Sequence, residues 1–249
     1  MSFISFGGSS SMANKLNITS RKVYDAPNYD VTAFGVPGLS GDVIVPQNRF
    51  KNKTIVYNGY IRGKDFSGSS NWEKMSNGTR SVKAWLLSDP GVYKDLRDDY
   101  DPGFSRFAYC ESVNFDQVHD LSFGATFEIR FVAKPFLYDY AHNSTVTITA
   151  SSTFTNPYEF DSYPTFSIIV TGSPATFSVN GSTWTITGLS ANTTVACDTE
   201  AMEWYTSTSL VNDKVSGPAP FPKFTTGSNT VAPGNWVMGI GVTPNWRTL

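Results

Sequence analysis

The segment best equipped for chemistry is rich in aspartate: KDLRDDYDPGFSRF, from Lys94 to Phe107. Four aspartates and one arginine lie within seven residues, beside a proline and a glycine. Carboxylates at this density are typical of a metal or acid–base site. They are equally typical of a turn, because aspartate stabilises turns through hydrogen bonds to its own backbone.

A calcium loop of the EF-hand type needs oxygen ligands at fixed steps and a bidentate glutamate at its twelfth position. Counting from Asp99, the chain supplies Asp99 and Asp101, but Pro102-Gly103 then interrupts the pattern and the twelfth position is Cys110. The pattern fails as a calcium loop. We therefore interpret the segment as a turn between two elements and predict neither a metal site nor a cofactor.

A second carboxylate group lies in CDTEAMEWY, from Cys197 to Tyr205, which we expect to form a strand of a β-sandwich. Its spacing resembles the E-x-D-x-x-E of some jelly-roll glucanases, but with Asp198 and Glu200 exchanged. Strand alternation places these two on one face, and Glu203 reaches that face only through a bulge. A retaining glycosidase needs its carboxyl groups about 5.5 Å apart. The sequence therefore favours a surface strand over a glycanase site.

Nucleophilic catalysis has little support. The two histidines, His119 and His142, are not near a nucleophile motif such as G-x-S-x-G, and no glycine-rich phosphate loop precedes a helix. Cys110 and Cys197 lie far apart without metal-ligand spacing, so we expect both to be reduced. We predict no catalytic residue and no enzymatic activity.

Sugar binding is a further alternative, because carbohydrate modules present flat aromatic rings beside polar groups. Galectins, however, carry H-x-N-P-R and W-x-x-E-x-R stretches, and this chain has neither. We expect most of the second-half tryptophans to pack in a core, with one or two at interfaces. They are Trp184, Trp204, Trp236 and Trp246.

Composition restricts the partners. The formal net charge of the 249-residue chain is -2, with both signs mixed along it, which argues against a basic nucleic-acid-binding face. Aromatic residues make up 14% of the chain against 16% charged, which is typical of a surface that packs on other subunits. No secretion signal or apolar run of about 20 residues is evident, so we expect a protein made and folded in a cytoplasm. Chance accounts for the Asn-X-Ser/Thr sites at Asn17, Asn52, Asn77, Asn143, Asn180 and Asn192.

Short strands with turns between them dominate the pattern. Asn58-Gly59, within Thr54–Gly63, and Asn180-Gly181, within Ala175–Leu189, each predict a two-residue hairpin turn. Ser122–Phe136 alternates as a half-buried strand, with Phe123, Ala125, Phe127, Ile129 and Phe131 on the apolar face. We expect similar strands at Ser144–Phe154 and Tyr163–Gly172.

One short helix is predicted at about residues 79–88, where Val82, Trp85 and Leu86 share a face and Asp89-Pro90-Gly91 ends it. Thr79 or Ser81 would cap its start. We expect a mainly β protein of two domains. Residues 1–138 would form a β domain that carries the helix, and residues 139–249 a sandwich or jelly roll.

Several stretches follow one another in a characteristic order and spacing. In the first half they are ISFGG, VPGLSGD (Val36–Asp42), SVKAWLL, DPGVYKDLRDDYDPGF and FEIRFVAKPFLYD, and in the second half TVACDTEAMEWY, FPKFTTGSNTV and GVTPNWRTL. Through the order and spacing of these stretches, the whole chain resembles the distal tail protein (Dit) family of siphophages. One departure is Leu39-Ser40, where the family more usually has Arg-Asp.

The resemblance implies two β-sandwich domains, the second like a galectin or carbohydrate-binding module. The first would form a hexameric ring, single or stacked in pairs, that joins the tail tube to the adsorption apparatus at the virion's tail tip. Partners would include the tail tube protein, a tail-associated or tape-measure protein, and receptor-binding or baseplate proteins held by the second domain. DNA would pass through without specific binding. The alternative function is a carbohydrate-binding module for attachment to the host surface.

Overall fold

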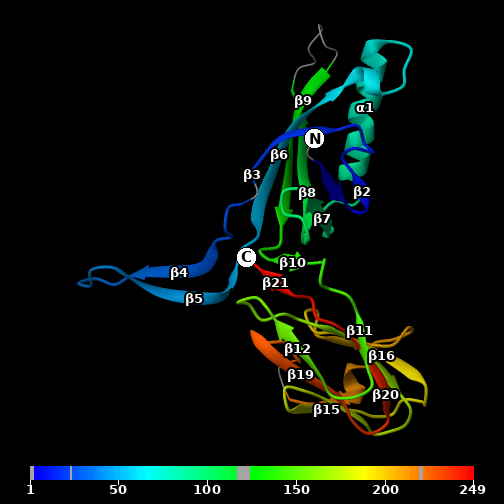
Figure 1. Ribbon diagram of the computed structural model, residues 1–249. Helices are drawn as coiled ribbons and strands as arrows, with labels where there is room; N and C mark the ends of the chain where they lie inside the picture. The colour runs from blue at the N-terminus through cyan, green and yellow to red at the C-terminus, as the bar shows by residue number, and fades with distance from the viewer. Residues whose placement is uncertain (1–2, 23, 117–123, 219–220) are drawn as a thin grey trace. The chain divides into compact units, whose positions relative to one another are not determined.

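The computed structural model describes residues 3–22, 24–116, 124–218 and 221–249 (Figure 1). The chain divides into two compact units, which we call unit 1 (residues 1–137 with Leu249) and unit 2 (residues 138–248). Nearly all regular structure is antiparallel β, which confirms the predicted mainly β class. His119 and Phe123, both considered above, lie outside the described residues.

Unit 1 is built on one antiparallel sheet with the strand order β2-β1-β7-β8-β9-β6-β3. These strands are β1 (Ile4–Phe6), β2 (Ser9–Ser10), β3 (Asn17–Lys22), β6 (Lys53–Arg62), β7 (Lys94–Asp98), β8 (Phe104–Phe115) and β9 (Gly124–Ala133). The predicted alternation of β9 is confirmed, because Phe127, Ile129 and Phe131 are buried and Thr126 and Arg130 are exposed.

The hairpin predicted at Asn58-Gly59 is wrong. Both residues lie inside the continuous strand β6, which pairs with β3 on one side and β9 on the other. Gly59 is needed there for close packing: a Cβ at this position would lie 2.1 Å from the Asn17 carbonyl oxygen and 2.5 Å from Cζ of Phe127. A glycine inside a strand commonly marks such a close backbone approach.

The helix α1 runs from Asn71 to Leu86, after the short 3₁₀ turn η1 (Gly63–Asp65), so it begins eight residues before the predicted start. Its N-cap is Ser70, whose side chain accepts a hydrogen bond from Glu73 N at 3.1 Å.

The buried face of α1 has the spacing of an amphipathic helix and consists of Met75, Gly78, Val82 and Leu86. The three apolar members belong to the core cluster of the sheet. Burying each contributes on the order of 1.5–3 kcal/mol.

Two further strands of unit 1, β4 (Tyr29–Gly35) and β5 (Asp42–Phe50), pair only with each other. They form a two-stranded antiparallel ribbon, drawn in blue in Figure 1, which we call the arm (residues 29–50). Nearly every residue of both strands is exposed. The arm therefore does not contribute to the core of its own unit.

Unit 2 contains two five-stranded antiparallel sheets. The first has the order β11 (Val146–Ile148), β20 (Val237–Thr243), β13 (Thr165–Val170), β16 (Thr193–Asp198) and β17 (Glu203–Tyr205). The second has the order β12 (Ser152–Asn156), β19 (Gly227–Pro233), β14 (Ala175–Val179), β15 (Ser182–Ile186) and β18 (Val215–Ser216). The remaining elements are the short strands β10 (Leu137–Asp139) and β21 (Arg247–Thr248) and the 3₁₀ turn η2 (Asn212–Lys214).

The inner faces of these two sheets share one aromatic core, as expected of a β-sandwich. Phe166 and Phe177 come from opposite sheets, and their ring centroids lie 6.0 Å apart. The hairpin predicted at Asn180-Gly181 is confirmed: both residues have positive φ, 51° and 79°, and Val179 pairs with Ser182. The predicted strand Ser144–Phe154 is wrong as a single strand, because it is divided into β11 and β12, which belong to different sheets.

Candidate assembly surface

The arm carries exposed apolar residues on both of its faces. In the register of β4 and β5, Ala33 pairs with Ile44 and Phe34 pairs with Val43. Successive residues of a strand point to opposite faces, so these two pairs lie on opposite sides of the ribbon. The exposed fractions are 54% for Phe34, 63% for Ile44 and 44% for Val43. Exposed apolar area of this kind is typical of interaction surfaces.

The tip of the arm is the VPGLSGD stretch. It contains Gly38 and Gly41, which have positive φ of 83° and 93°, the conformation that glycine adopts at little cost. Leu39, at the position where the Dit pattern more usually has arginine, is 57% exposed. The tip therefore presents an apolar side chain.

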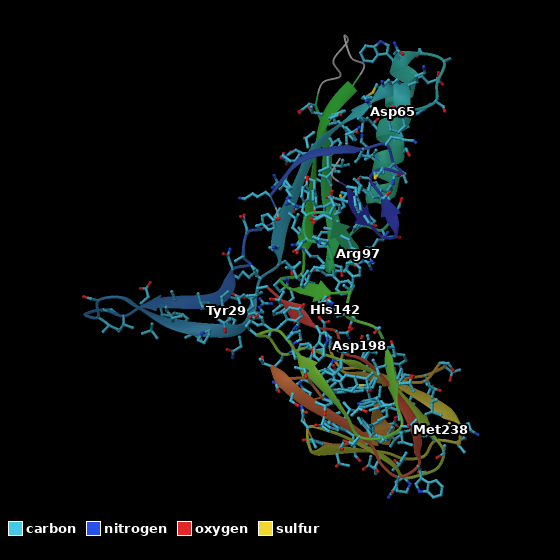
Figure 2. The ribbon with its side chains drawn as sticks, in the orientation of Figure 1. Tyr29, Asp65, Arg97, His142, Asp198 and Met238 are labelled. Atoms are coloured by element: carbon cyan, nitrogen blue, oxygen red, sulfur yellow. The ribbon has the colours of Figure 1, made fainter. Side chains whose placement is uncertain are left out.

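The base of the arm is held by a compact ion cluster. Asp30 is buried, and its carboxylate accepts a hydrogen bond from Arg49 Nε at 2.9 Å. It also forms ion pairs with Arg49 Nη2 at 2.8 Å and with Lys51 Nζ at 3.1 Å. The hydrogen bond from Lys51, and then that from Arg49, lower the pKa of the Asp30 carboxyl. Beside it, the rings of Tyr29 and Phe50 meet edge to face at 5.2 Å (Figure 2 labels Tyr29). The ion cluster and this ring contact thus join β4 to β5 and the residue after it at the base of the arm.

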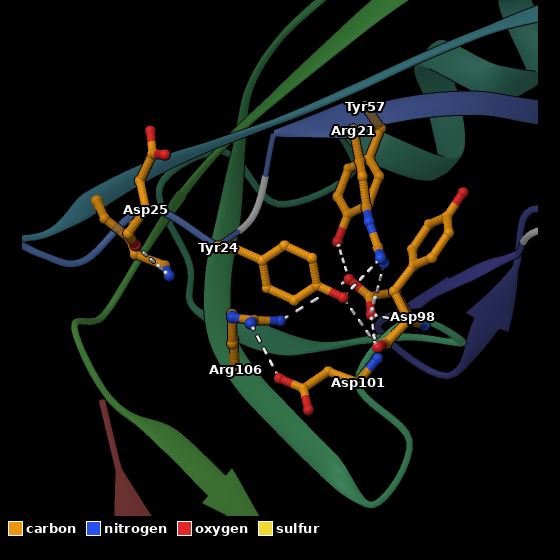
Figure 3. A network of polar contacts seen from close by, with 9 residues as sticks. Arg21, Tyr24, Asp25, Tyr57, Asp98, Asp101 and Arg106 are labelled. Carbon is orange, nitrogen blue, oxygen red and sulfur yellow. Dashed lines mark hydrogen bonds and ion pairs between the residues drawn. The ribbon is translucent and has the colours of Figure 1, made fainter.

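The aspartate-rich segment contains β7, the turn at residues 99–103 and the first residues of β8, so the predicted turn is confirmed over residues 99–103. Its most buried carboxylate belongs to Asp98, which accepts a hydrogen bond from the Tyr57 hydroxyl at 2.6 Å (Figure 3). The backbone N–H groups of Tyr100 and Asp101 each donate to Asp98 Oδ1 at 3.1 Å. These bonds close the turn and leave the Asp98 carboxylate engaged with the protein itself.

Two arginines complete this network from different elements. Arg106, on β8, lies 3.8 Å from Asp98 and 3.4 Å from Asp101, and Arg21, on β3, lies 3.9 Å from Asp98 (Figure 3). Arg21 Nη2 also donates to the Tyr24 hydroxyl at 2.7 Å. Tyr24 belongs to residues 24–28, the segment that leads into the arm. The aspartate-rich turn therefore fixes the chain just before the arm.

The chain that leaves the arm is tied to the same segment. Lys51 N donates to the Asn28 carbonyl at 2.8 Å, and Lys53 Nζ donates to the Asp25 carbonyl at 2.9 Å. Burial, with a smaller contribution from Arg106, lowers the pKa of Lys53 to about 8. Both connections of the arm thus meet at one polar cluster.

The carboxylates Asp198, Glu200 and Glu203 do not lie on one strand as predicted. A turn over residues 199–202 separates β16 from β17, so Asp198 and Glu203 face each other as a cross-strand pair. Asp198 Oδ1 accepts hydrogen bonds from the backbone of Glu200 and Ala201, each at 3.0 Å. The aspartate stabilises its turn, so this arrangement gives no support to a glycosidase site.

The tryptophans mostly occupy the core, as predicted: Trp184, Trp204 and Trp246 are 6%, 3% and 6% exposed. Trp236 is 56% exposed. The thiols of Cys110 and Cys197 are buried and free, and burial raises the pKa of each. Neither thiol is in the state of a reactive nucleophile.

His142 is the one histidine within the described residues. Its Nδ1 lies 2.9 Å from Oδ2 of the buried Asp139, which also accepts a hydrogen bond from the Tyr158 hydroxyl at 2.7 Å. Burial favours the protonated Asp139 carboxyl, but the hydrogen bonds from Tyr158 and His142 outweigh it and lower the pKa. The three side chains tie β10 to the loop after β12.

Sequence reasoning missed the arm. It singled out the tip, VPGLSGD, without the strands on either side. The usable signal was the pair of short apolar and β-branched runs, VTAFG before the tip and DVIVP after it, separated by Pro37-Gly38 and Gly41. Within the described part of the chain, no three His, Cys, Asp or Glu residues are grouped to hold a metal ion, and no helix is long and apolar enough to cross a membrane.

Comparison with solved structures shows which fold this is. The chain matches the SPP1 Dit protein, described as a paradigm of the hub adsorption apparatus in phages that infect Gram-positive bacteria, with a TM-score of 0.71 over 100% of both chains at 9% sequence identity. It also matches chains of the phage p2 baseplate in its activated conformation. The strontium form gives a TM-score of 0.52 and the calcium form 0.50, each over 97% of both chains at 8% identity.

No protein-family model and no curated protein sequence matches the chain. The similarity is therefore one of fold, and it covers the full length. At this level the resemblance predicted from the sequence motifs is confirmed: the chain has the Dit hub fold.

Proposed function

We propose that this chain is a distal tail protein, a structural hub at the tail tip of a siphophage, and not an enzyme. The observation that carries the proposal is the arm. A two-stranded ribbon is marginally stable alone in water, and this one exposes apolar residues on both faces. The full-length match to the SPP1 Dit fold supports the same role.

Identical copies would supply the cover that the arm lacks. If the arm of one subunit packs on the next, the contact is heterologous, and heterologous contacts close into a ring when the rotation between subunits divides a full turn. Both edges of the ribbon are free to extend a sheet, since β4 and β5 pair only with each other among the described strands. We propose that unit 1 forms such a ring, with six subunits as the Dit resemblance implies.

The ring would join the tail tube to the adsorption apparatus and leave a central channel for DNA. A formal net charge of -2 suits a channel through which DNA slides, because lysine and arginine drive binding to phosphates. Unit 2 would hold the receptor-binding or other baseplate proteins. A ring structure whose channel is lined mainly by lysine and arginine would contradict the proposed passage.

The test combines light scattering after size exclusion with negative-stain imaging of the peak. We expect rings of six copies, or stacked pairs of rings. The double variant Phe34→Asp/Ile44→Asp places one aspartate on each face of the arm. This variant should be monomeric and should retain the wild-type circular dichroism spectrum. Leu210→Asp is the matched control, because Leu210 lies in unit 2 and is 62% exposed, like Ile44 at 63%.

The control should assemble as the wild type does. A wild type that stays monomeric at all concentrations would contradict self-assembly into a ring. Rings that survive both arm substitutions would exclude the arm as the interface and move the search to the edge strands of the unit 1 sheet.

A further inference from the structure

A hollow opens along one side of unit 2, beside the last strands of its two sheets. These strands are β17 and β18, and the chain joins them through η2. The hollow has a volume of about 380 Å³, and its apolar lining includes Trp184 on β15, Trp204 on β17, Met202, Val215 and Phe221. An adjoining hollow of about 200 Å³ shares Trp184 and Phe221 with it. We call the two together the side groove.

Two indole rings form the walls of the side groove. Trp204 stacks on Phe221, with ring centroids 5.9 Å apart and ring planes at 26°. The other indole, that of Trp184, packs so closely on the backbone of Gly217 that a Cβ there would lie 2.1 Å from its Cδ1. Both tryptophans are buried members of the unit 2 core. The walls are therefore fixed by the fold itself, as is usual for a preformed binding site.

Each indole also brings a hydrogen-bond donor that the protein leaves unused. Among the described residues, none accepts a hydrogen bond from Nε1 of Trp184 or of Trp204. Buried indole N–H groups usually have a partner, because an unpaired donor costs free energy. A ligand that carries hydrogen-bond acceptors beside its apolar groups would supply what these two donors lack.

The edge of β17 is closed to a further strand by the protein's own chain. Val211 N donates to the Trp204 carbonyl at 2.7 Å, and Trp204 N donates to Asn212 Oδ1 at 2.6 Å. A bound segment therefore cannot pair with this backbone as an added β-strand, and the indole donors remain for it. A helix would offer them few acceptors, because it bonds its own carbonyls. A polyproline II segment keeps its carbonyls free beside apolar proline rings, and grooves lined by aromatic residues bind such segments.

Three carboxylates lie next to the residues that line the side groove: Asp198, Glu203 and Asp213. Glu203 and Asp213 are exposed, and each is adjacent in sequence to a lining residue. Asp198 pairs with Glu203 across the hairpin (Figure 2 labels Asp198). None of the three forms an ion pair with any residue that the structure describes.

The two lysines near the side groove are engaged by the protein itself. Lys223 lines the adjoining hollow and pairs with Asp161, and Lys214 Nζ donates to the Gly188 carbonyl at 3.4 Å. The three carboxylates therefore set the sign of the charge beside the groove. Complementary charge favours a ligand that carries a cation next to its apolar part.

We propose that the side groove binds an extended, proline-rich segment of a partner protein with a lysine or arginine beside its prolines. The proline rings pack on the aromatic walls, the carbonyls of the segment accept hydrogen bonds from Trp184 and Trp204, and its cation pairs with Glu203 or Asp213. Proline fixes φ, so such a segment is extended before it binds and loses little entropy. The inference goes beyond the hub role, because it names the chemistry of a partner and holds whether or not unit 1 forms a ring.

The experiment screens the full-length protein against a synthetic array of P-x-x-P peptides whose flanking residue is arginine, glutamate or serine. A matched series has alanine in place of every proline. We expect binding by peptides flanked by arginine, and none by the glutamate or the alanine series. The tightest arginine peptide and its glutamate counterpart are then titrated by fluorescence anisotropy.

The indole donor and the apolar lining are tested by single substitutions. Trp184→Phe keeps an aromatic ring but removes the N–H, and it should weaken binding about threefold to tenfold, the effect of one hydrogen bond. Met202→Lys places a charge in the groove and should weaken binding at least about tenfold, because the ammonium repels the peptide's cation and disrupts apolar contact. Met238→Lys is the matched control, since Met238 is 56% exposed, like Met202 at 60%, and lies on β20 outside the lining.

The charge preference is tested by the double variant Glu203→Lys/Asp213→Lys. It should weaken binding of the arginine peptide at least about tenfold and allow the glutamate counterpart to bind, an exchange that a loss of folding could not produce. The circular dichroism spectrum and the urea midpoint of unit 2 show that each variant is folded.

The proposal is overturned if no P-x-x-P peptide binds, or if the alanine series binds as well as the proline series. It is also overturned if Trp184→Phe binds as the wild type does, if Met202→Lys binds as tightly as Met238→Lys, or if the charge-reversed variant still prefers arginine. Light scattering measures ring assembly separately, so failure here leaves the hub proposal intact.

Discussion

Replacing Asp98 with asparagine tests whether the aspartate-rich turn anchors the start of the arm. The side chain of Asp98 is 0% exposed, and that of its partner Arg106 is 3% exposed. Asparagine keeps the shape of the side chain but removes the negative charge between two guanidinium groups. Breaking one partner of a buried ion pair costs about 3–5 kcal/mol, because the remaining charge is left unpaired.

A second variant separates charge from hydrogen bonding. Tyr57→Phe removes the hydroxyl that donates to Asp98 Oδ2 at 2.6 Å and leaves the ion pairs in place. A hydrogen bond to a charged group is worth roughly 1.5–3 kcal/mol. We therefore expect Tyr57→Phe to cost less than Asp98→Asn. The double variant should cost less than the sum of the two, since both substitutions act on one network.

The assay is urea unfolding followed by tryptophan fluorescence and circular dichroism, in which the two units should unfold in separate transitions. The transition of unit 2 is the internal reference and should not move. Asp95→Asn is the matched control on the same strand, because Asp95 pairs with Arg97 at the surface, and exposed pairs contribute about 0–1 kcal/mol. If Asp98→Asn costs no more than Asp95→Asn, the network does not anchor the arm and the reasoning is refuted.

Three further substitutions have defined outcomes in the same unfolding assay. Folding lowers the pKa of Lys53 from 10.5 to about 8, so the unfolded chain binds more protons than the folded one between these pH values. The free energy of unfolding of the wild type should therefore rise relative to that of Lys53→Met as pH rises from about 8 to 10.5. Parallel plots of the two unfolding free energies against pH would contradict this. Folding lowers the pKa of Asp139 from 3.8, so the carboxylate's contribution to the stability of unit 2 is complete above pH 3.8 and is lost as pH falls through the lower folded value. Asp139→Asn should therefore make the unfolding midpoint of unit 2 less sensitive to acid. An unchanged sensitivity would exclude this carboxylate as its source. Gly59→Ala places a Cβ 2.1 Å from the Asn17 carbonyl and should destabilise unit 1 by at least about 1–3 kcal/mol, whereas a neutral effect would argue against the register of β3 and β6.

The two Asn-Gly pairs show what sequence alone can decide. At Asn180-Gly181 both residues have positive φ and form the predicted turn, because the flanking strands pair with each other. At Asn58-Gly59 the same dipeptide is extended, because β3 and β9 bond to the two edges of β6. Whether an Asn-Gly pair turns therefore depends on which strands lie beside it, and that is set by contacts distant in the sequence.

The start of the helix was predictable from the sequence. Ser70 and Glu73 have the spacing of a capping box. Glu73 N donates to Ser70 Oγ at 3.1 Å, and Ser69 N, one residue before the N-cap, donates to Glu73 Oε2 at 2.6 Å. The predicted helix instead began at about residue 79, with Thr79 or Ser81 as its cap, so it left out Gly78. Gly78 lies within the helix, and the Phe66 ring packs so closely against it that a Cβ would lie 2.7 Å from Cδ2 of that ring. The ring therefore requires glycine at this position. A glycine required by a neighbouring aromatic ring cannot be distinguished locally from one that ends a helix.

The carboxylates that first suggested chemistry acquire a mechanical role once the arm is recognised. A ribbon that is exposed on both faces holds a fixed direction only if its own base is rigid. Asp30 fixes that base through Arg49 and Lys51. Asp98, on β7, holds the segment that leads into the arm through Arg21, which contacts Tyr24. Charge-assisted hydrogen bonds to these two buried carboxylates are directional, whereas apolar contacts alone would allow the ribbon to pivot. The density of aspartate in the turn is thus explained by what must be held in place beside it.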